Sequence, residues 1–168
     1  MLGLDPGSRF TGWGVVDCQG SRLRPISHGR FALASAGELP RRLARLDMQV
    51  RGLIAEHAPD VAALESLFHG VNPRSLIVLA QARGVLLAAL ALAEVDVREY
   101  SPAQIKTSVT GFGRADKDQV GRMVRQILGL RSDELSPDAA DALAAAICLG
   151  QRARLDAFVA QRPASALR

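Results

Sequence analysis

The sequence contains few aromatic residues, few cysteines and no long apolar run. Aromatic side chains make up 4% of the 168 residues, so Leu, Val, Ile and Ala must supply most of the core. The two cysteines, Cys18 and Cys148, have no CxxC spacing, which favours buried free thiols in a reducing cytoplasm. The longest apolar stretch, residues 85–93, is too short to cross a bilayer, and no signal-peptide pattern is visible. We therefore expect a cytoplasmic protein with no membrane span.

Lysine is the scarcest of the charged residues. Lys106 and Lys117 are the only lysines, so nearly all of the basic charge is Arg. The formal net charge of +4 is compatible with a polyanionic partner, although many basic proteins bind no nucleic acid. A compact ammonium suits some phosphate contacts better than a planar guanidinium does. The two lysines are thus either phosphate contacts or residues retained by chance on an exposed surface, and composition alone does not separate these readings.

The overall composition is that of one folded domain. A hydrophobic content of 48% argues against disorder, and 168 residues are enough to bury a real core. We expect a single domain over residues 1–160, followed by a flexible tail over residues 161–168.

Turn signals and hydrophobic periodicity divide the sequence into strands and helices. Three opening strands are separated by Pro-Gly, Gly-Ser and Gln-Gly signals and should form an antiparallel meander, with Pro25 and Gly29 interrupting the third. The later strands alternate with helices, which predicts a mixed α/β sheet with helices on both faces. In chain order, the predicted elements are strands over residues 1–5, 11–17 and 22–33, a helix over 39–54, a strand over 61–64, a helix over 73–93, a strand over 95–100, and helices that begin at 101–102, 116 and 136–137.

The predicted helix over residues 73–93 is apolar well beyond one stripe. Asn72 is a good N-cap, and Pro73 suits the first helical position. One sheet face cannot cover so wide an apolar surface. We therefore expect a partner helix to pack on it, either from this chain or from a second subunit.

Four acidic residues lie where a globular core has little reason to hold them. Asp5 and Glu65 each end an apolar strand, while Asp138 and Asp141 lie three residues apart at the head of an Ala-rich helix. Asp5 alone could be an ordinary turn residue before Pro-Gly, and Asp138 alone could be a partner of the helix dipole. Glu65 and Asp141 are harder to explain, because a lone carboxylate in apolar surroundings is costly unless it is paired or bound to a cation.

Strand ends and one helical face can bring these four carboxylates together in space. Converging carboxylates repel one another unless a cation lies between them, and a set of oxygen ligands favours Mg²⁺ or Mn²⁺. Two such ions about 3.5–4 Å apart could activate a water and stabilise a leaving oxygen. The pattern therefore predicts two-metal hydrolysis of a phosphodiester. His28, His57 and His69 show no metal-ligand spacing to one another.

Several motifs give the sequence a close resemblance to the RuvC family of Holliday junction resolvases. Residues 2–15 (LGLDPGSRFTGWGV) resemble the opening signature of that family, and residues 63–68 (ALESLF) resemble its second motif. Residues 81–84 (QARG) match its dimer helix, and residues 138–143 (DAADAL) match its final acidic motif. The resemblance extends from the first residues to about residue 149.

The resemblance implies a ribonuclease H-like fold with a five-stranded mixed sheet, and a nuclease that resolves four-way DNA junctions in recombination and repair. It implies that Asp5, Glu65, Asp138 and Asp141 are the catalytic metal ligands, with two Mg²⁺ ions per site and Mn²⁺ as a substitute. It further implies a homodimer and a branch-migration motor as partners. The DNA contacts it implies are Phe68, which would stack on an unpaired base, together with Lys106, Lys117, Asn72 and Arg74.

Two departures from the family pattern and three competing readings accompany this assignment. Family members usually have a residue or two more before the first strand. The pair Ser66-Leu67 also differs from the pair common in the family, and this second difference affects sequence preference rather than catalysis. The competing readings are a phosphotransferase of the actin and hexokinase type, a junction-binding module without catalysis, and a ribonuclease H that acts on RNA–DNA hybrids. The first would need a second domain, for which this chain has no room.

Overall fold

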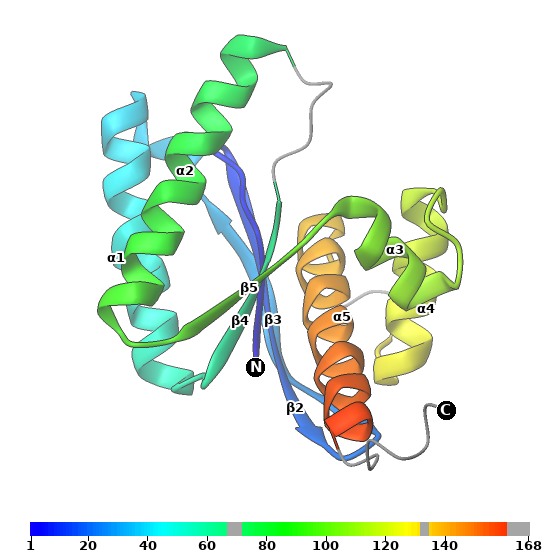
Figure 1. Ribbon diagram of the computed structural model, residues 1–168. Coiled ribbons are helices and arrows are strands. Elements are labelled where there is room, and N and C mark those ends of the chain that lie inside the picture. Colours follow the sequence, from blue (N-terminus) through cyan, green and yellow to red (C-terminus); the bar gives the residue numbers. More distant parts are fainter. Residues whose placement is uncertain (67–71, 132–134, 161–168) are drawn as a thin grey trace.

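The protein folds around one five-stranded mixed sheet, as the sequence predicts (Figure 1). The computed structural model describes residues 1–66, 72–131 and 135–160, with side chains to residue 156. The predicted tail, residues 161–168, lies outside this range and stays a prediction. The strands are β1 (Leu2–Asp5), β2 (Phe10–Gln19), β3 (Arg22–Ala32), β4 (Val61–Glu65) and β5 (Asp96–Tyr100). Their order is β3-β2-β1-β4-β5, in which the first three form the predicted antiparallel meander and β1, β4 and β5 run parallel.

Helices cover both faces of this sheet. Figure 1 shows α1 and α2 on one side and α3, α4 and α5 on the other. The alternation of side chains along β1 sends Leu2 and Leu4 into the core with α1 and α2, and leaves Gly3 facing α5. The sheet therefore separates two hydrophobic cores. The helices are α1 (Leu39–His57), α2 (Pro73–Leu92), α3 (Pro102–Thr110), α4 (Lys117–Leu128) and α5 (Pro137–Ala160), with a short 3₁₀ turn at Ala34–Ala36 that the sequence did not predict.

Strand β3 is continuous, so the predicted interruption at Pro25 and Gly29 is wrong in detail. The register with β2 shifts where Val15 pairs with Ser27 and Val16 pairs with Pro25, which leaves one extra residue on β3. Such a bulge accommodates a proline within an edge strand. Gly29 also stays paired with β2, opposite Trp13. Glycine suits this position because the indole of Trp13 occupies the space where a side chain would be.

Side chains cap the starts of α2, α3 and α4. Ser101 with Gln104, and Asp116 with Gln119, form reciprocal capping boxes at the starts of α3 and α4. Asn72 caps α2 by accepting a hydrogen bond from the backbone N–H of Arg74 at 3.0 Å. These local bonds explain why the predicted starts agree with the structure to within about a residue.

Helix α2 buries only part of its apolar surface. Ala82, Leu86, Ala89 and Leu90 face α1 and the sheet, so the predicted partner helix is α1 of the same chain. Ile77 and Leu92 remain 61% and 70% exposed on the rest of the surface. By length and composition alone, α2 could cross a membrane, and it is the one such helix among the described residues. The core helix of a soluble protein can have the same length and composition.

Helix α5 lies directly against the backbone of the central strand β1 and of its neighbour β2. A side chain at Gly3 would overlap the carbonyl oxygen of Ala142, and one at Gly12 would overlap the carbonyl oxygen of Asp138. Glycine at both positions lets the helix approach the sheet at backbone distance. This close approach sets the height at which the first turn of α5 stands over the end of β1.

We predict that Gly3→Ala destabilises the protein, because the added methyl group must push α5 away from β1. Overpacking of this kind costs about 1–3 kcal/mol, which should lower the melting temperature by several degrees. Gly52→Ala is the matched control, since that glycine lies inside α1 with nothing within 4 Å of the added carbon. The control should gain about 1 kcal/mol from helix propensity. Thermal unfolding that gives the two variants the same sign of change would contradict this account of the packing.

Candidate active site

The carboxylates of Asp5 and Glu65 emerge at one edge of the sheet. Each is the last residue of its strand, and β1 and β4 are parallel neighbours in the register that pairs Leu4 with Leu64. Parallel strands that end together present their last side chains side by side. Asp5 and Glu65 are therefore adjacent for a topological reason that involves no direct bond between them.

Helix α5 adds the other two carboxylates to this edge. Asp138 and Asp141 lie in its first turns, and the backbone of Asp138 is packed on Gly12, which is the register partner of Asp5. Asp5, Glu65 and Asp141 line one pocket of about 250 Å³ at the boundary of the sheet, α3, α4 and α5. Asp138 is not among the residues that line this pocket, but its charge contributes to raising the pKa of Asp5. The fold thus gathers four acidic residues that are spread over most of the sequence.

Burial and like charge make this cluster unfavourable when it is fully ionised. The pKa of Asp5 is raised to about 8, first by burial and then by the charges of Asp141 and Glu65. Burial, followed by the charge of Asp141, also raises the pKa of Glu65 above its ordinary value. Lys117 opposes both shifts. A group of carboxylates that resists ionisation without a counter-charge is an electrostatic environment in which a cation binds well.

Both lysines of the sequence lie in the same pocket. Lys106 comes from α3 and Lys117 from the start of α4. Both helices are distant in sequence from Asp5 and Glu65. The Nζ atom of Lys117 lies 3.1 Å from Oδ2 of Asp141, and the charge of Asp141 raises the pKa of Lys117. This convergence favours the interpretation of the lysines as phosphate contacts, and the role of each stays a prediction.

Arg30 is a neighbour of the cluster that the sequence analysis missed. Its Nη1 atom lies 3.3 Å from Oδ2 of Asp138, and its guanidinium lies 4.6 Å from the centre of the Phe10 ring. The ring and the carboxylate together orient the guanidinium. Arg30 pairs with Gly12 across β2 and β3, so knowledge of the strand register was needed to find it.

The chemistry of these donors fits a hard divalent cation. All four are carboxylates, and oxygen ligands suit Mg²⁺ or Mn²⁺. Over residues 1–66, 72–131 and 135–160, no three Asp, Glu, His or Cys side chains form a ready-made metal cage. Lys117 pairs with Asp141 and Arg30 pairs with Asp138, so a metal ion would compete with these two basic side chains for the carboxylates.

The remaining predicted DNA contacts lie at the start of α2 or just before it. Asn72 and Arg74 are exposed, and the side chain of Asn72 is engaged in capping the helix. Phe68 and His69 fall outside the described residues. The ring of His57 lies 6.4 Å from that of Trp13, on the α1 side of the sheet, away from the carboxylates. No histidine in the described part of the chain lines the acidic pocket.

Comparisons with known proteins agree on one family. A family model described as crossover junction endodeoxyribonuclease RuvC matches residues 1–149. A crossover junction endodeoxyribonuclease RuvC of Rubrobacter xylanophilus is 50% identical over 148 residues, which cover 88% of this chain and 83% of the relative. The Syntrophomonas wolfei protein of the same description is 40% identical over 159 residues, covering 95% of this chain and 92% of the relative.

Solved structures show the same fold. The structure of Thermus thermophilus RuvC in complex with a Holliday junction substrate superposes with a TM-score of 0.85 at 31% identity, covering 92% of this chain and 94% of that chain. The yeast mitochondrial Holliday junction resolvase Ydc2 has a TM-score of 0.66 at 16% identity, covers 94% of this chain and 80% of that chain, and supports the fold alone. The predicted ribonuclease H-like architecture is therefore confirmed, and the chain belongs to the RuvC family of crossover junction endodeoxyribonucleases.

Proposed function

We propose that this protein is an endonuclease that resolves four-way DNA junctions by symmetric, metal-dependent cutting, in recombination and DNA repair. The observation that carries the proposal is the meeting of Asp5, Glu65 and Asp141 with Lys106 and Lys117 in one pocket of a RuvC-family chain. The acidic side of such a pocket suits metal ions and its basic side suits a phosphate. We place the protein in the cytoplasm, with a branch-migration motor as a further partner.

Each residue of the pocket has a proposed task. Asp5, Glu65, Asp138 and Asp141 would hold two Mg²⁺ ions, or Mn²⁺ in their place, which when bound activate a water and stabilise the leaving oxygen. Lys117 and Lys106 would hold the phosphodiester in line with the carboxylates by charge-assisted hydrogen bonds. Phe68, which follows Glu65 by three residues, would stack on an unpaired base at the junction.

A symmetric pair of cuts requires two active sites related by a two-fold axis, so we propose a homodimer. The exposed face of α2 is the proposed interface. Exposed small residues recur along it at helical spacing between the two large apolar side chains, Ile77 and Leu92, and small side chains allow close approach of two helices. The exposed positions on this stripe are Ile77, Ala80, Gln81, Gly84, Ala88 and Ala91.

The decisive test is a cleavage assay on several nucleic acids. Mobile and immobile four-way DNA junctions, linear duplex and an RNA–DNA hybrid are each incubated with Mg²⁺, with Mn²⁺ or with chelator. Paired symmetric nicks on the mobile junction alone, abolished by chelator, are the expected result. Cutting of the hybrid would instead indicate a ribonuclease. Tight junction binding without cutting under either metal would indicate a structural module, and stabilisation by nucleotides would revive the phosphotransferase reading.

We predict that replacing any one of the four carboxylates with its amide abolishes cutting and spares junction binding. Asn and Gln keep the shape of the side chain but lose the charge that holds the metal, so the rate should fall about a hundredfold or more. Asp60→Asn is the matched control, since this exposed Asp precedes the opposite end of β4 from Glu65. A variant that cuts at the rate of the control would remove that residue from the proposed metal site.

We predict that Asp5→Asn stabilises the metal-free protein increasingly as the pH rises from about 5 to 8. The pKa of Asp5 is raised from 3.8 to about 8 in the folded state, so the folded protein binds this proton more tightly than the unfolded chain does. The free energy of unfolding of the wild type therefore falls as the pH rises through this range, and the amide removes that loss.

The measurement is the melting temperature of both proteins in chelator across this pH range. Each kcal/mol corresponds to about 2–4 °C for a domain of this size. Added Mg²⁺ at pH 8 should raise the melting temperature of the wild type more than that of the variant. If the difference in melting temperature between the two proteins does not change with pH, the pKa of Asp5 is not raised in the folded protein.

We predict that Ala88→Glu converts the protein from a dimer to a monomer, because it buries two like charges at the centre of the α2 interface. Ile26→Glu is the control, since Ile26 is 51% exposed on β3, at the other edge of the sheet. Sedimentation gives the mass, and the cleavage assay should show loss of paired cuts. A wild type that sediments as a monomer at micromolar concentration would refute the dimer, and one that needs detergent would favour a membrane role for α2.

A further inference from the structure

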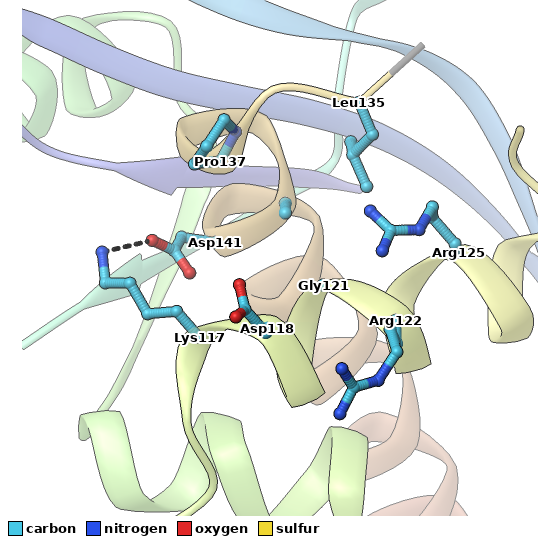
Figure 2. Close-up of a pocket in the computed structure, with 9 residues that line it drawn as sticks. Lys117, Asp118, Gly121, Arg122, Arg125, Leu135, Pro137 and Asp141 are labelled. Carbon is cyan, nitrogen blue, oxygen red and sulfur yellow. Dashed lines mark hydrogen bonds and ion pairs between the residues drawn. The ribbon is translucent and has the colours of Figure 1, made fainter. Parts of the chain in front are cut away.

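A second pocket adjoins the carboxylate pocket, between α4 and the start of α5 (Figure 2). Its volume is about 290 Å³, and it shares Lys117 and Asp141 with the carboxylate pocket. Two arginines of α4, Arg122 and Arg125, complete its basic lining. Neither arginine was singled out by the sequence analysis.

The charges of this second pocket are divided between its two sides. Figure 2 shows Lys117, Asp118 and Asp141 on one side and both arginines on the other. Of the two acidic groups, Asp141 also lines the carboxylate pocket, and it pairs there with Lys117 at 3.1 Å. The far side presents two guanidinium groups, whose planar donors match a phosphate well.

Gly121 keeps this pocket open. It is buried in the middle of α4, where glycine weakens a helix. Packing does not require glycine there, because the nearest atom to an added Cβ would be Nη1 of Arg125 at 3.8 Å. A larger side chain at this position would enter the space in front of the arginines.

We propose that the second pocket binds a second phosphate of the DNA strand that is being cut, next to the phosphate held at the carboxylates. A DNA strand carries a charge at every nucleotide. A strand seated beside Lys117 therefore brings a neighbouring phosphate past Arg122 and Arg125. This contact fixes the direction and register of the strand across the catalytic carboxylates. The inference rests on the proposed nuclease function and adds a binding site to it.

The test combines charge removal on the protein with charge removal on the DNA. Single uncharged methylphosphonates are placed at each phosphate on both sides of the cut, and junction affinity is measured in chelator. One position should weaken binding of the wild type about tenfold, as expected when a charge-assisted hydrogen bond is removed. In the double variant Arg122→Ala/Arg125→Ala, the same substitution should cost less than about twofold, because the guanidinium groups that meet this phosphate are already absent.

Two further variants distinguish a specific phosphate-binding site from non-specific electrostatic attraction to DNA. Arg41→Ala removes the same kind of charge from an exposed position on α1, on the opposite face of the sheet, and should behave like the wild type. Gly121→Leu fills the pocket without changing the net charge, and should abolish the methylphosphonate effect as the arginine variants do. Thermal unfolding checks that each variant is folded. If Gly121→Leu does not fold, the arginine variants still test whether the second pocket binds a phosphate.

Salt dependence gives an independent measure. The slope of log affinity against log salt should fall by about one unit for each phosphate that the protein no longer neutralises, so the double variant should have a shallower slope than Arg41→Ala. Equal methylphosphonate effects in the wild type and the double variant at every position, or an unchanged slope, would overturn the inference. If the wild type cuts junctions but the methylphosphonate effect does not depend on the two arginines, the phosphate site in the second pocket is refuted and the proposed function stands. If the effect depends on the two arginines in a protein that never cuts, the proposed function alone is refuted.

Discussion

The arrangement of the site depends on the backbone contact between α5 and the central strands. Gly3 and Gly12 leave room for the carbonyl oxygens of Ala142 and Asp138, so the backbone of the helix packs directly on the backbone of the sheet. That close packing brings Asp138 and Asp141 to the strand ends that carry Asp5 and Glu65. Without it, the two pairs of carboxylates would belong to separate layers, and no acidic pocket would form.

The resulting cluster is held together against its own electrostatics. Burial and neighbouring charge raise the pKa of Asp5 to about 8, while Lys117 and Arg30 each neutralise one carboxylate of α5. These two cations occupy the carboxylates that metal ions would bind. Under the proposed function, metal ions bound at these carboxylates would leave Lys117 and Arg30 free to contact phosphate. The basic side of the site then extends along α4 to Arg122 and Arg125.

Much of the fold and the site was accessible from sequence because the signals are local. Capping residues at Asn72, Ser101 and Asp116 mark helix starts, and strand ends at Asp5 and Glu65 follow short apolar runs. The bulge in β3 was misread as an interruption, because whether an edge strand tolerates a proline depends on its pairing partner. Asp5, Glu65 and Asp141 line one pocket, Asp138 is not among its lining residues, and the role of each of the four stays a prediction.

The types and order of the elements and the family could be read from the amino-acid sequence, as could the placement of Asp5, Glu65 and Asp141 near one another. They follow from patterns within a few residues of each position and from short sequence motifs that are contiguous in the chain. Three features came to light only in the folded chain: Arg30 pairs with Asp138, α1 covers one face of α2 while Ile77 and Leu92 stay exposed, and Arg122 and Arg125 share a pocket with Lys117. Such pairs depend on strand register and on where helices cross the sheet, and both are set by packing between distant segments.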